Sequence, residues 1–252
     1  MKKISSLLLL FACMQHVNCQ EKVKRGEAFY LLDENFKGTT TEKARYFMHT
    51  VKIADTCWQF DTYHLFGPMI SSEQFKDEAG SEANGFFYYY NKKGTLDSSG
   101  KYNSGFQNGE WYYFNDTGKV VMKKDYSMGG VILKEDYLKD KGDQTDTSAK
   151  HIEIESDFNG GIQGWIYYLT KNLRYPERAM NSDVQGKVVV IFIIDTNGRV
   201  LEPVIRTSVE YSLDQEALRL VKESPAWSPA TIDGKKVKAY KLQPITFRLT
   251  TN

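Results

Sequence analysis

The sequence predicts an α+β protein, in which an all-β antiparallel repeat sheet is followed by a mixed domain of helices and strands. Two observations support this class. Segments rich in Gly and Tyr repeat at an offset of 24 residues before residue 130, and amphipathic helices and apolar strands alternate after residue 158. The 252 residues allow one to three domains. We expect a signal peptide at 1–19, the repeat domain at 20–138, a polar linker at 139–157 and the mixed domain at 158–252.

The N-terminus has the features of an export signal. Lys2 and Lys3 precede an apolar run from Leu7 to Met14, which is far shorter than the roughly 20 residues that a membrane-spanning helix needs. Cleavage after Cys19 would leave Gln20 as the first residue. Alternatively, "LFAC" at residues 10–13 resembles a lipoprotein signal, which would place a lipid on Cys13. Both routes predict an exported protein, soluble or tethered by lipid.

Charge and cysteine content exclude some classes of protein. If Cys13 and Cys19 leave with the signal, Cys57 has no partner for an internal disulfide, and we interpret it as a packed thiol. Without residues 1–19 the chain has 31 basic and 32 acidic residues. A net charge of −1 argues against a nucleic-acid-binding protein.

The sequence offers no catalytic apparatus. His49, His64 and His151 lie far apart, and their spacing does not match that of metal ligands. The chain contains no G-x-S-x-G motif, no paired cysteine motif and no phosphate-binding loop. We therefore expect a protein that is not an enzyme, with no catalytic residues, no metal and no cofactor.

The repeat is clearest in two adjacent segments. "GFFYYYNKKGTLDSSGKYNSG", from Gly85, aligns with "GEWYYFNDTGKVVMKKDYSMG", from Gly109. A weaker copy precedes them at an offset of 27, where Gly67 corresponds to Gly94. Each unit has an aromatic strand, a turn with glycine and a second strand, which predicts β-hairpins side by side with aromatic side chains in the shared core.

These repeats resemble the MORN-type repeats of the YwqK-like antitoxin family over residues 58–130, and the resemblance implies a scaffold for binding. Four aromatic residues of the repeats have two interpretations. They form hairpin core and cross-strand pairs, which we favour, or they bind glycan at a cell wall or cell surface. The four are Tyr88, Tyr90, Trp111 and Tyr113.

The second half opens with a helix, a strand and a tight turn. Trp165, Tyr168, Leu169 and Leu173 recur at helical spacing, and the helix should end before Tyr175–Pro176. The proline either stops this helix or starts another short one. "KVVVIFIID", after Gly186, predicts a strand buried on at least one face, and "DTNG" at 195–198 predicts a hairpin turn into "RVLEPVIRTS".

A second helix and a last strand complete the domain. Ser212 and Gln215 match a capping box, which predicts a helix from about Leu213 to Glu223. The final strand, "VKAYKLQPITFRLT", contains Pro244, which lacks an amide donor. This strand is therefore expected at an edge of the sheet or with a bulge, and an exposed edge can accept another chain.

These motifs together resemble the TonB C-terminal domain family. The matching segments are Phe158 to Gly161, Asn172 to Pro176, Gly186 to Val200, Leu213–Asp214, Ala217–Leu218, Trp227 to Ala230, Gly234–Lys235 and Pro244 to Phe247. Asn159 departs from the usual proline. The resemblance implies two helices on a three-stranded antiparallel sheet. It also implies a Gram-negative envelope protein whose last strand pairs with a segment of an outer-membrane transporter.

The family's transducers also have an uncleaved membrane anchor and a long Pro-rich spacer, and we find neither motif. We therefore expect a non-enzymatic envelope adapter that binds a TonB-dependent outer-membrane transporter, or a similar envelope protein, by β-strand addition. Its lysines Lys235, Lys236, Lys238 and Lys241 either favour an acidic partner or protect the edge from aggregation. A strand-exchanged homodimer is physically allowed. The expected partner-binding residues are Tyr175, Pro176, Lys236, Lys238, Tyr240, Lys241, Leu242, Ile245 and Phe247.

Overall fold

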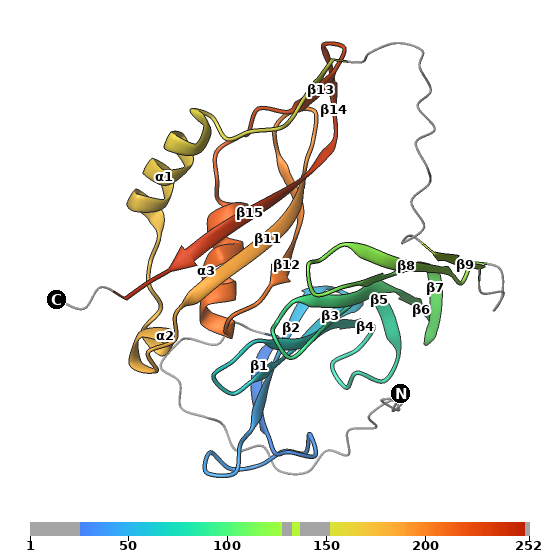
Figure 1. Cartoon of the computed structure of the whole chain (residues 1–252). Coiled ribbons are helices and arrows are strands. Elements are labelled where there is room, and N and C mark those ends of the chain that lie inside the picture. Colours follow the sequence, from blue (N-terminus) through green and yellow to red (C-terminus); the bar gives the residue numbers. More distant parts are fainter. Residues whose placement is uncertain (1–25, 128–132, 137–151, 250–252) are drawn as a thin grey trace. The chain divides into compact units, whose positions relative to one another are not determined.

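The computed structural model describes residues 26–127, 133–136 and 152–249 (Figure 1). The signal peptide, the lipidation site at Cys13, the cleavage site at Cys19–Gln20, His151 and most of the expected linker lie outside these residues. The chain divides into two compact units, residues 1–139 and 140–252. Each is described by itself.

The N-terminal unit is a nine-stranded antiparallel sheet, which confirms the expected all-β class. Its strands lie side by side in chain order, so each strand pairs with its sequence neighbours. They are β1 Glu27–Leu32, β2 Tyr46–Ala54, β3 Cys57–His64, β4 Met69–Phe75, β5 Ala83–Tyr90, β6 Leu96–Asn103, β7 Phe106–Phe114, β8 Val120–Asp125 and β9 Leu133–Asp136. The sheet begins two strands before the first copy of the sequence repeat.

The repeat in the sequence corresponds to a repeated turn. In the β5–β6 turn the Asn91 amide donates to the Thr95 carbonyl, and in the β7–β8 turn the Asn115 amide donates to the Lys119 carbonyl. Gly94 and Gly118 follow at φ 76° and 84°. The β3–β4 turn has the same backbone bonds, from His64 to Pro68. Three hairpins therefore share the same backbone hydrogen bonds at the offsets found in the sequence, although Gly67 lacks the positive φ of Gly94 and Gly118.

Aromatic side chains fill the core of this sheet. Trp111 is only 2% exposed, and its ring meets Tyr102 edge-on at 5.4 Å between centroids. The indole Nε1 donates to the Lys101 carbonyl. Toward the first strands the core continues with Leu32, Met48 and Phe60, against which Phe75 packs. The repeated aromatic positions are therefore largely structural.

The C-terminal unit has the expected three-stranded antiparallel sheet, in the order β12-β11-β15. Strand β11 spans Gly186–Ile194, β12 spans Val200–Thr207 and β15 spans Ala239–Phe247. A second small sheet has the order β10-β13-β14, formed by Glu153–Ile154, Ala230–Ile232 and Lys235–Val237. Strand β10 falls within the segment expected as linker and pairs with β13.

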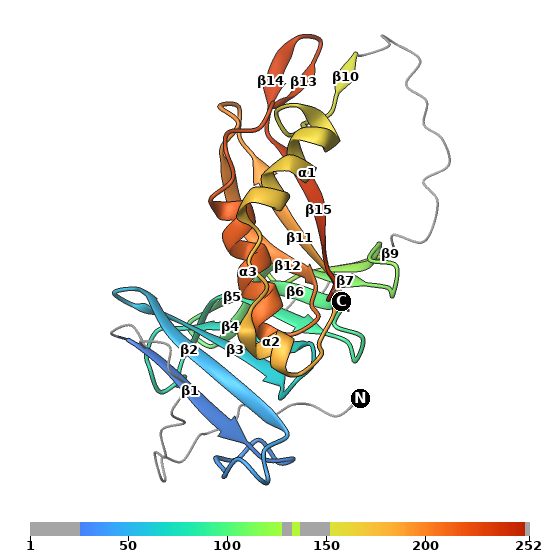
Figure 2. The same ribbon diagram turned by 90° about the vertical axis from the view of Figure 1, so that its left-hand side faces the viewer.

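The helices lie on one side of the main sheet (Figure 2). They are α1 Gly161–Asn172, α2 Glu177–Asn181 and α3 Tyr211–Lys222. The buried face of α3 consists of Leu213, Ala217, Leu220 and Val221, all at 0% exposure. It faces the alternate residues of β11, which are also buried: Val188, Val190, Phe192 and Ile194. Two long helices cover the sheet as expected, and α2 follows Pro176 as a short third helix.

The expected capping box at Ser212 is wrong. The N-cap of α3 is Glu210, whose carboxylate accepts hydrogen bonds from the amide and the hydroxyl of Ser212. Ser212 therefore lies inside the first turn. Glu210 is fully buried, and Arg178 of α2 pairs with it, so the cap also joins two helices. A pattern of residue types does not reveal this ion pair, because its partners are far apart in sequence.

Candidate functional site

The candidate site is the free edge of β15. Among the described residues β15 pairs only with β11, in a register running from Gly186 opposite Phe247 to Ile194 opposite Ala239. As expected for a strand with a proline, it lies at the edge of its sheet. Its side chains alternate: Gln243, Ile245 and Phe247 are buried, whereas Tyr240 and Leu242 are 74% and 54% exposed. The strand thus offers an unpaired backbone edge beside an exposed apolar face.

Four of the expected partner-binding residues hold this strand in place. Ile245 and Phe247 are 0% and 1% exposed and face the helices. The Tyr175 ring meets Phe247 perpendicularly at 5.9 Å, and its hydroxyl donates to the Val184 carbonyl at 2.6 Å. Burial raises the pKa of this hydroxyl. Pro176 is the residue before α2. These residues fix the end of β15 and are poorly placed to touch a partner's side chains.

The expected basic cluster is divided. Lys235 and Lys236 belong to β14, in the small sheet, while Lys238 is exposed just before β15. Lys241 is only 22% exposed. Its ammonium donates to the Ser156 carbonyl at 2.7 Å and lies 3.9 Å from the Asp157 carboxylate. Of the four lysines, Lys238 is therefore the one that presents an exposed charge next to the edge.

Helix α1 runs beside β15. The segment before the helix contacts Lys241 near the start of the strand, and Tyr175 after the helix contacts Phe247 at its end. Both elements descend in the same direction in Figures 1 and 2. At about 1.5 Å per helical residue and 3.3 Å per strand residue, the 12-residue helix is about 18 Å long and the nine-residue strand about 30 Å. Helix α1 therefore covers only part of the length of β15, and the segments before and after the helix make the contacts near the two ends of the strand.

The outward side of α1 has three exposed apolar residues among polar ones such as Gln163 and Lys171. Ile162 and Ile166 are 64% and 49% exposed, and Tyr167 is 66% exposed. These residues are not among the partner-binding residues expected from the sequence. The four-residue spacing of the two isoleucines was the available signal, since it places both on one side of a helix. Trp165 is the buried anchor of α1, with its ring 5.6 Å from Trp227, which in turn meets Phe192 of β11 at 5.2 Å.

Polar contacts from α3 fix the chain as it leaves α1. The Glu216 carboxylate accepts from the Arg174 amide at 2.7 Å. The Arg219 guanidinium donates to the Asn172 carbonyl at 2.7 Å and also pairs with Glu216. The Tyr168 hydroxyl donates to the Leu220 carbonyl. These bonds set where α1 ends and hence where it lies beside β15.

The aromatic residues considered for glycan binding do not form one platform. Trp111 is buried, so its ring offers no stacking surface to solvent. It packs against Tyr89, whereas Tyr88 stacks with Phe86 at 6.1 Å. Because successive strand residues point to opposite faces, Tyr88 lies on the other face from Tyr89. Tyr90 and Tyr113 are half-buried. This arrangement gives a glycan site no particular support.

The histidines and the cysteine have structural surroundings. His49 is buried on β2, with its Nε2 2.7 Å from Glu27 and its Nδ1 3.8 Å from Asp61. Burial acts to lower the pKa of His49, but these two carboxylates outweigh it and raise the pKa. Cys57 is half-buried, and burial raises the pKa of its thiol. Within the described residues no group of three or more His, Cys, Asp or Glu side chains could hold a metal ion.

Comparison with known protein families gives a match in the C-terminal unit. Residues 171–249 match the model of the family described as Gram-negative bacterial TonB protein C-terminal. Curated proteins and solved structures gave no match. The C-terminal unit is therefore similar to this family over the matched residues. The resemblance of residues 58–130 to MORN-type repeats stays a prediction. None of the helices in the described part of the chain is long and apolar enough to span a membrane.

Proposed function

We propose that the chain is a non-enzymatic adapter of the TonB type in a Gram-negative cell envelope. Its C-terminal unit would bind a short peptide segment of an outer-membrane transporter by strand addition to β15. The observation that carries this proposal is the free edge of β15 within the region that matches the TonB C-terminal family. An edge strand with unpaired backbone groups is a template for an added strand.

Side chains on both sides of the edge would contact an added strand. Tyr240 and Leu242 lie on one face of the sheet and are exposed. On the other face, α1 follows β15 and presents Ile162 and Ile166. Since residues of a strand point alternately to the two faces, an added peptide would place alternate side chains against each apolar surface. The backbone would supply affinity and these surfaces would supply specificity.

The charge near the edge favours an acidic peptide. Lys238 is exposed before β15, and Lys187 is exposed on β11, which pairs with β15. Lys241 is already bonded to Ser156, so its charge contributes less. Exposed charges of this kind affect association rate and partner choice more than affinity. We expect the preference for acidic peptides to weaken as salt is added.

Strand addition can be tested with modified peptides. The purified chain is titrated with fluorescent peptides from the N-termini of TonB-dependent transporters, and binding is followed by anisotropy. Two sets of N-methylated peptides block alternate backbone amides. We expect one set to lose binding and the other to keep it, because only alternate amides of an added strand face β15. Equal binding by both sets, or none by any unmodified peptide, would contradict the proposal.

Substitutions locate the contact. Leu242→Ala and Ile166→Ala should each weaken peptide binding about tenfold, because each removes an apolar contact from the edge. The matched control is Ile232→Ala, which removes an exposed isoleucine from the small sheet. If Ile232→Ala weakens binding as much as the other two, the peptide does not bind at β15. A strand-exchanged homodimer would occupy the same edge, so the titration is paired with sedimentation velocity.

A further inference from the structure

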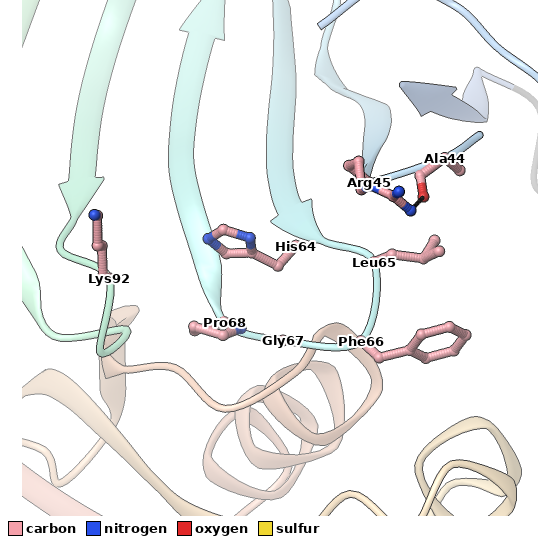
Figure 3. A pocket seen from close by; sticks show the side chains of 8 residues that line it. All are labelled: Ala44, Arg45, His64, Leu65, Phe66, Gly67, Pro68 and Lys92. Atoms are coloured by element: carbon pink, nitrogen blue, oxygen red, sulfur yellow. Dashed lines mark hydrogen bonds between the residues drawn. The ribbon is translucent and has the colours of Figure 1, made fainter. Parts of the chain in front are cut away.

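A small hollow lies at one end of the nine-stranded sheet, in the N-terminal unit (Figure 3). Its volume is about 430 Å³. It is lined by the two residues before β2, by the β3–β4 turn and by the β5–β6 turn. The charged or titratable lining residues are Arg45, His64 and Lys92, and the apolar ones include Leu65, Phe66 and Pro68. In Figure 3, His64 lies between Lys92 and Arg45.

His64 is the first residue of the β3–β4 turn, a position at which the neighbouring hairpins have a side chain that caps the turn. The corresponding first residues of the other three turns are Asp33, Asn91 and Asn115. Each uses its side-chain oxygen to accept hydrogen bonds from the amides two and four residues later. Such side-chain caps stabilise turns. The β3–β4 turn has the same backbone bonds but lacks this cap.

Two changes in sequence remove the cap together. The first change is His64, whose imidazole stands where the other turns have the side-chain oxygen of Asp or Asn. The second is Pro68, which stands four residues later, where the other turns have a backbone amide that donates to that oxygen. Pro68 has no N–H. His64 therefore faces the hollow, and its ring lies 5.3 Å from Tyr46. This turn departs from its neighbours at residues that line the hollow, and the replacement brings in a side chain that can carry a positive charge.

The hollow is positive and has no acidic wall. No Asp or Glu lines it, and among the described residues neither Arg45 nor Lys92 has a carboxylate partner. The adjacent lysine differs. Lys93, in the same turn as Lys92, pairs with Asp116 of the β7–β8 turn at 2.8 Å. The charge of Lys93 is therefore neutralised by Asp116 of the next hairpin, whereas Lys92 keeps its positive charge at the hollow.

We propose that this hollow binds an oxyanion, a phosphate or a carboxylate, carried on a group with an apolar face. Arg45 and Lys92 supply fixed positive charge, and the guanidinium can donate two parallel hydrogen bonds to such an anion. His64 supplies a third donor. Phe66 is 55% exposed and offers a ring against which an apolar carrier can pack. This site is distinct from β15 and does not depend on the function proposed for the C-terminal unit.

Binding is tested by NMR on the full chain with three probes: inorganic phosphate, phenyl phosphate and choline. We expect saturable shifts of the Arg45, Gly67 and Lys92 amides with both phosphates and none with choline. Phenyl phosphate should bind more tightly, because its ring adds an apolar contact. The pKa of His64, which burial lowers in the free protein, should rise when phosphate binds, since the anion favours imidazolium. Linear shifts without saturation, or an unchanged His64 titration, would overturn the proposal.

Matched variants separate the site from general surface charge. Arg45→Ala and Lys92→Ala should each weaken phenyl phosphate binding about tenfold, the loss expected for one charge-assisted contact. Lys93→Ala removes the same charge from the same turn outside the hollow and should change binding less than twofold. If Lys93→Ala weakens binding as much as Lys92→Ala, the effect is general electrostatics and the proposal is wrong. Heteronuclear spectra of each variant verify the fold.

Sedimentation with lipid vesicles shows whether the bound anion is a lipid headgroup or a soluble phosphate. The chain is sedimented with vesicles of phosphatidylcholine alone or with phosphatidylglycerol added. If a lipid headgroup is the ligand, the anionic vesicles carry the chain down, and phenyl phosphate or Lys92→Ala releases it. If the ligand is a soluble phosphate, neither vesicle retains the chain while the NMR binding persists. Retention by anionic vesicles that phenyl phosphate and Lys92→Ala leave unchanged would contradict a role for the hollow.

Discussion

The indole ring of Trp111 lies directly on the backbone of Gly100. A Cβ atom added at Gly100 would be 2.2 Å from the ring, closer than real Cβ contacts come. Gly100 does not need an unusual backbone angle, so space alone explains the glycine. The contact joins β6 to β7, and it makes Gly100, which has no counterpart in the next copy of the repeat, a packing requirement of the aromatic core.

Gly100→Ala is therefore expected to destabilise the N-terminal unit by about 1–3 kcal/mol, the usual cost of overpacking a core. Urea denaturation followed by tryptophan fluorescence measures it. Gly38→Ala is the control, because a Cβ there would meet nothing within 4 Å. If the two variants unfold at the same urea concentration, the Trp111 contact is not rigid.

The raised pKa of Glu73 predicts that the stability of the fold depends on pH. Burial raises the pKa of this carboxyl from 4.5 to about 7, and hydrogen bonds from Ser71 and Tyr89 offset part of that rise. A folded pKa above the unfolded one means that the folded state holds the proton more tightly. This stabilisation is fully present below about pH 4.5 and is lost as pH rises through about 7.

We expect the free energy of unfolding to fall by up to about 3 kcal/mol between pH 4.5 and pH 8 through this carboxyl. Glu73→Gln should remove that part of the slope and be more stable than the wild type at pH 8. Urea titrations at both pH values check this. His49, whose pKa is also raised, gives a slope of the same sign and should keep it in the variant. An unchanged slope in Glu73→Gln would refute the assignment.

Alanine substitutions of Lys241 and Lys238 should have different effects on stability, although both lysines lie near β15. Lys241→Ala loses the hydrogen bond to Ser156 and should cost about 1 kcal/mol of stability, with faster amide exchange around residues 156–158. Lys238→Ala removes an exposed charge and should stay within about 0.5 kcal/mol. Hydrogen exchange by mass spectrometry and urea denaturation test the pair. Equal effects would mean that Lys241 does not anchor the segment before α1.

His64→Asn should weaken anion binding at the hollow and raise the free energy of unfolding. The asparagine amide oxygen can accept a hydrogen bond from the Phe66 amide, as at the neighbouring turns, so we expect the free energy of unfolding to rise by about 0.5–1 kcal/mol. Binding of phenyl phosphate should weaken. His64→Ala should weaken binding equally without the gain in stability. Tighter phosphate binding in His64→Asn would exclude the imidazole from the site.

Periodic features of the sequence predicted most of the fold. The 24-residue repeat corresponds to matching turns at Asn91 and Asn115. The apolar run "KVVVIFIID" corresponds to β11, whose alternate residues are buried as expected for a strand covered on at least one face. Interactions between distant residues were not predictable in this way. Glu210 takes the N-cap position expected for Ser212, and its ion pair with Arg178 joins residues that no local pattern connects. Likewise, only the folded chain places Ser156 on Lys241 and so divides the basic cluster.

For the candidate site, the sequence predicted the edge strand but not which side chains are available. Pro244 excluded β15 from a central position, since it lacks an amide donor. Residue type alone did not distinguish Ile245, which is buried, from Leu242, which is exposed. That distinction depends on which face the helices cover. The exposure of Ile162 and Ile166 likewise depends on how α1 packs, so the sequence alone did not identify them as candidate contact residues.

The strand order of the two units implies different folding rates. In the N-terminal sheet every strand pairs with its sequence neighbours, so all its contacts are local and each hairpin can form as soon as it leaves the ribosome or a translocation channel. In the C-terminal unit the central strand β11 must wait for β15, near the end of the chain, before its second side is paired. Until then β11 has an open apolar edge, and this interval is when the chain is most exposed to aggregation.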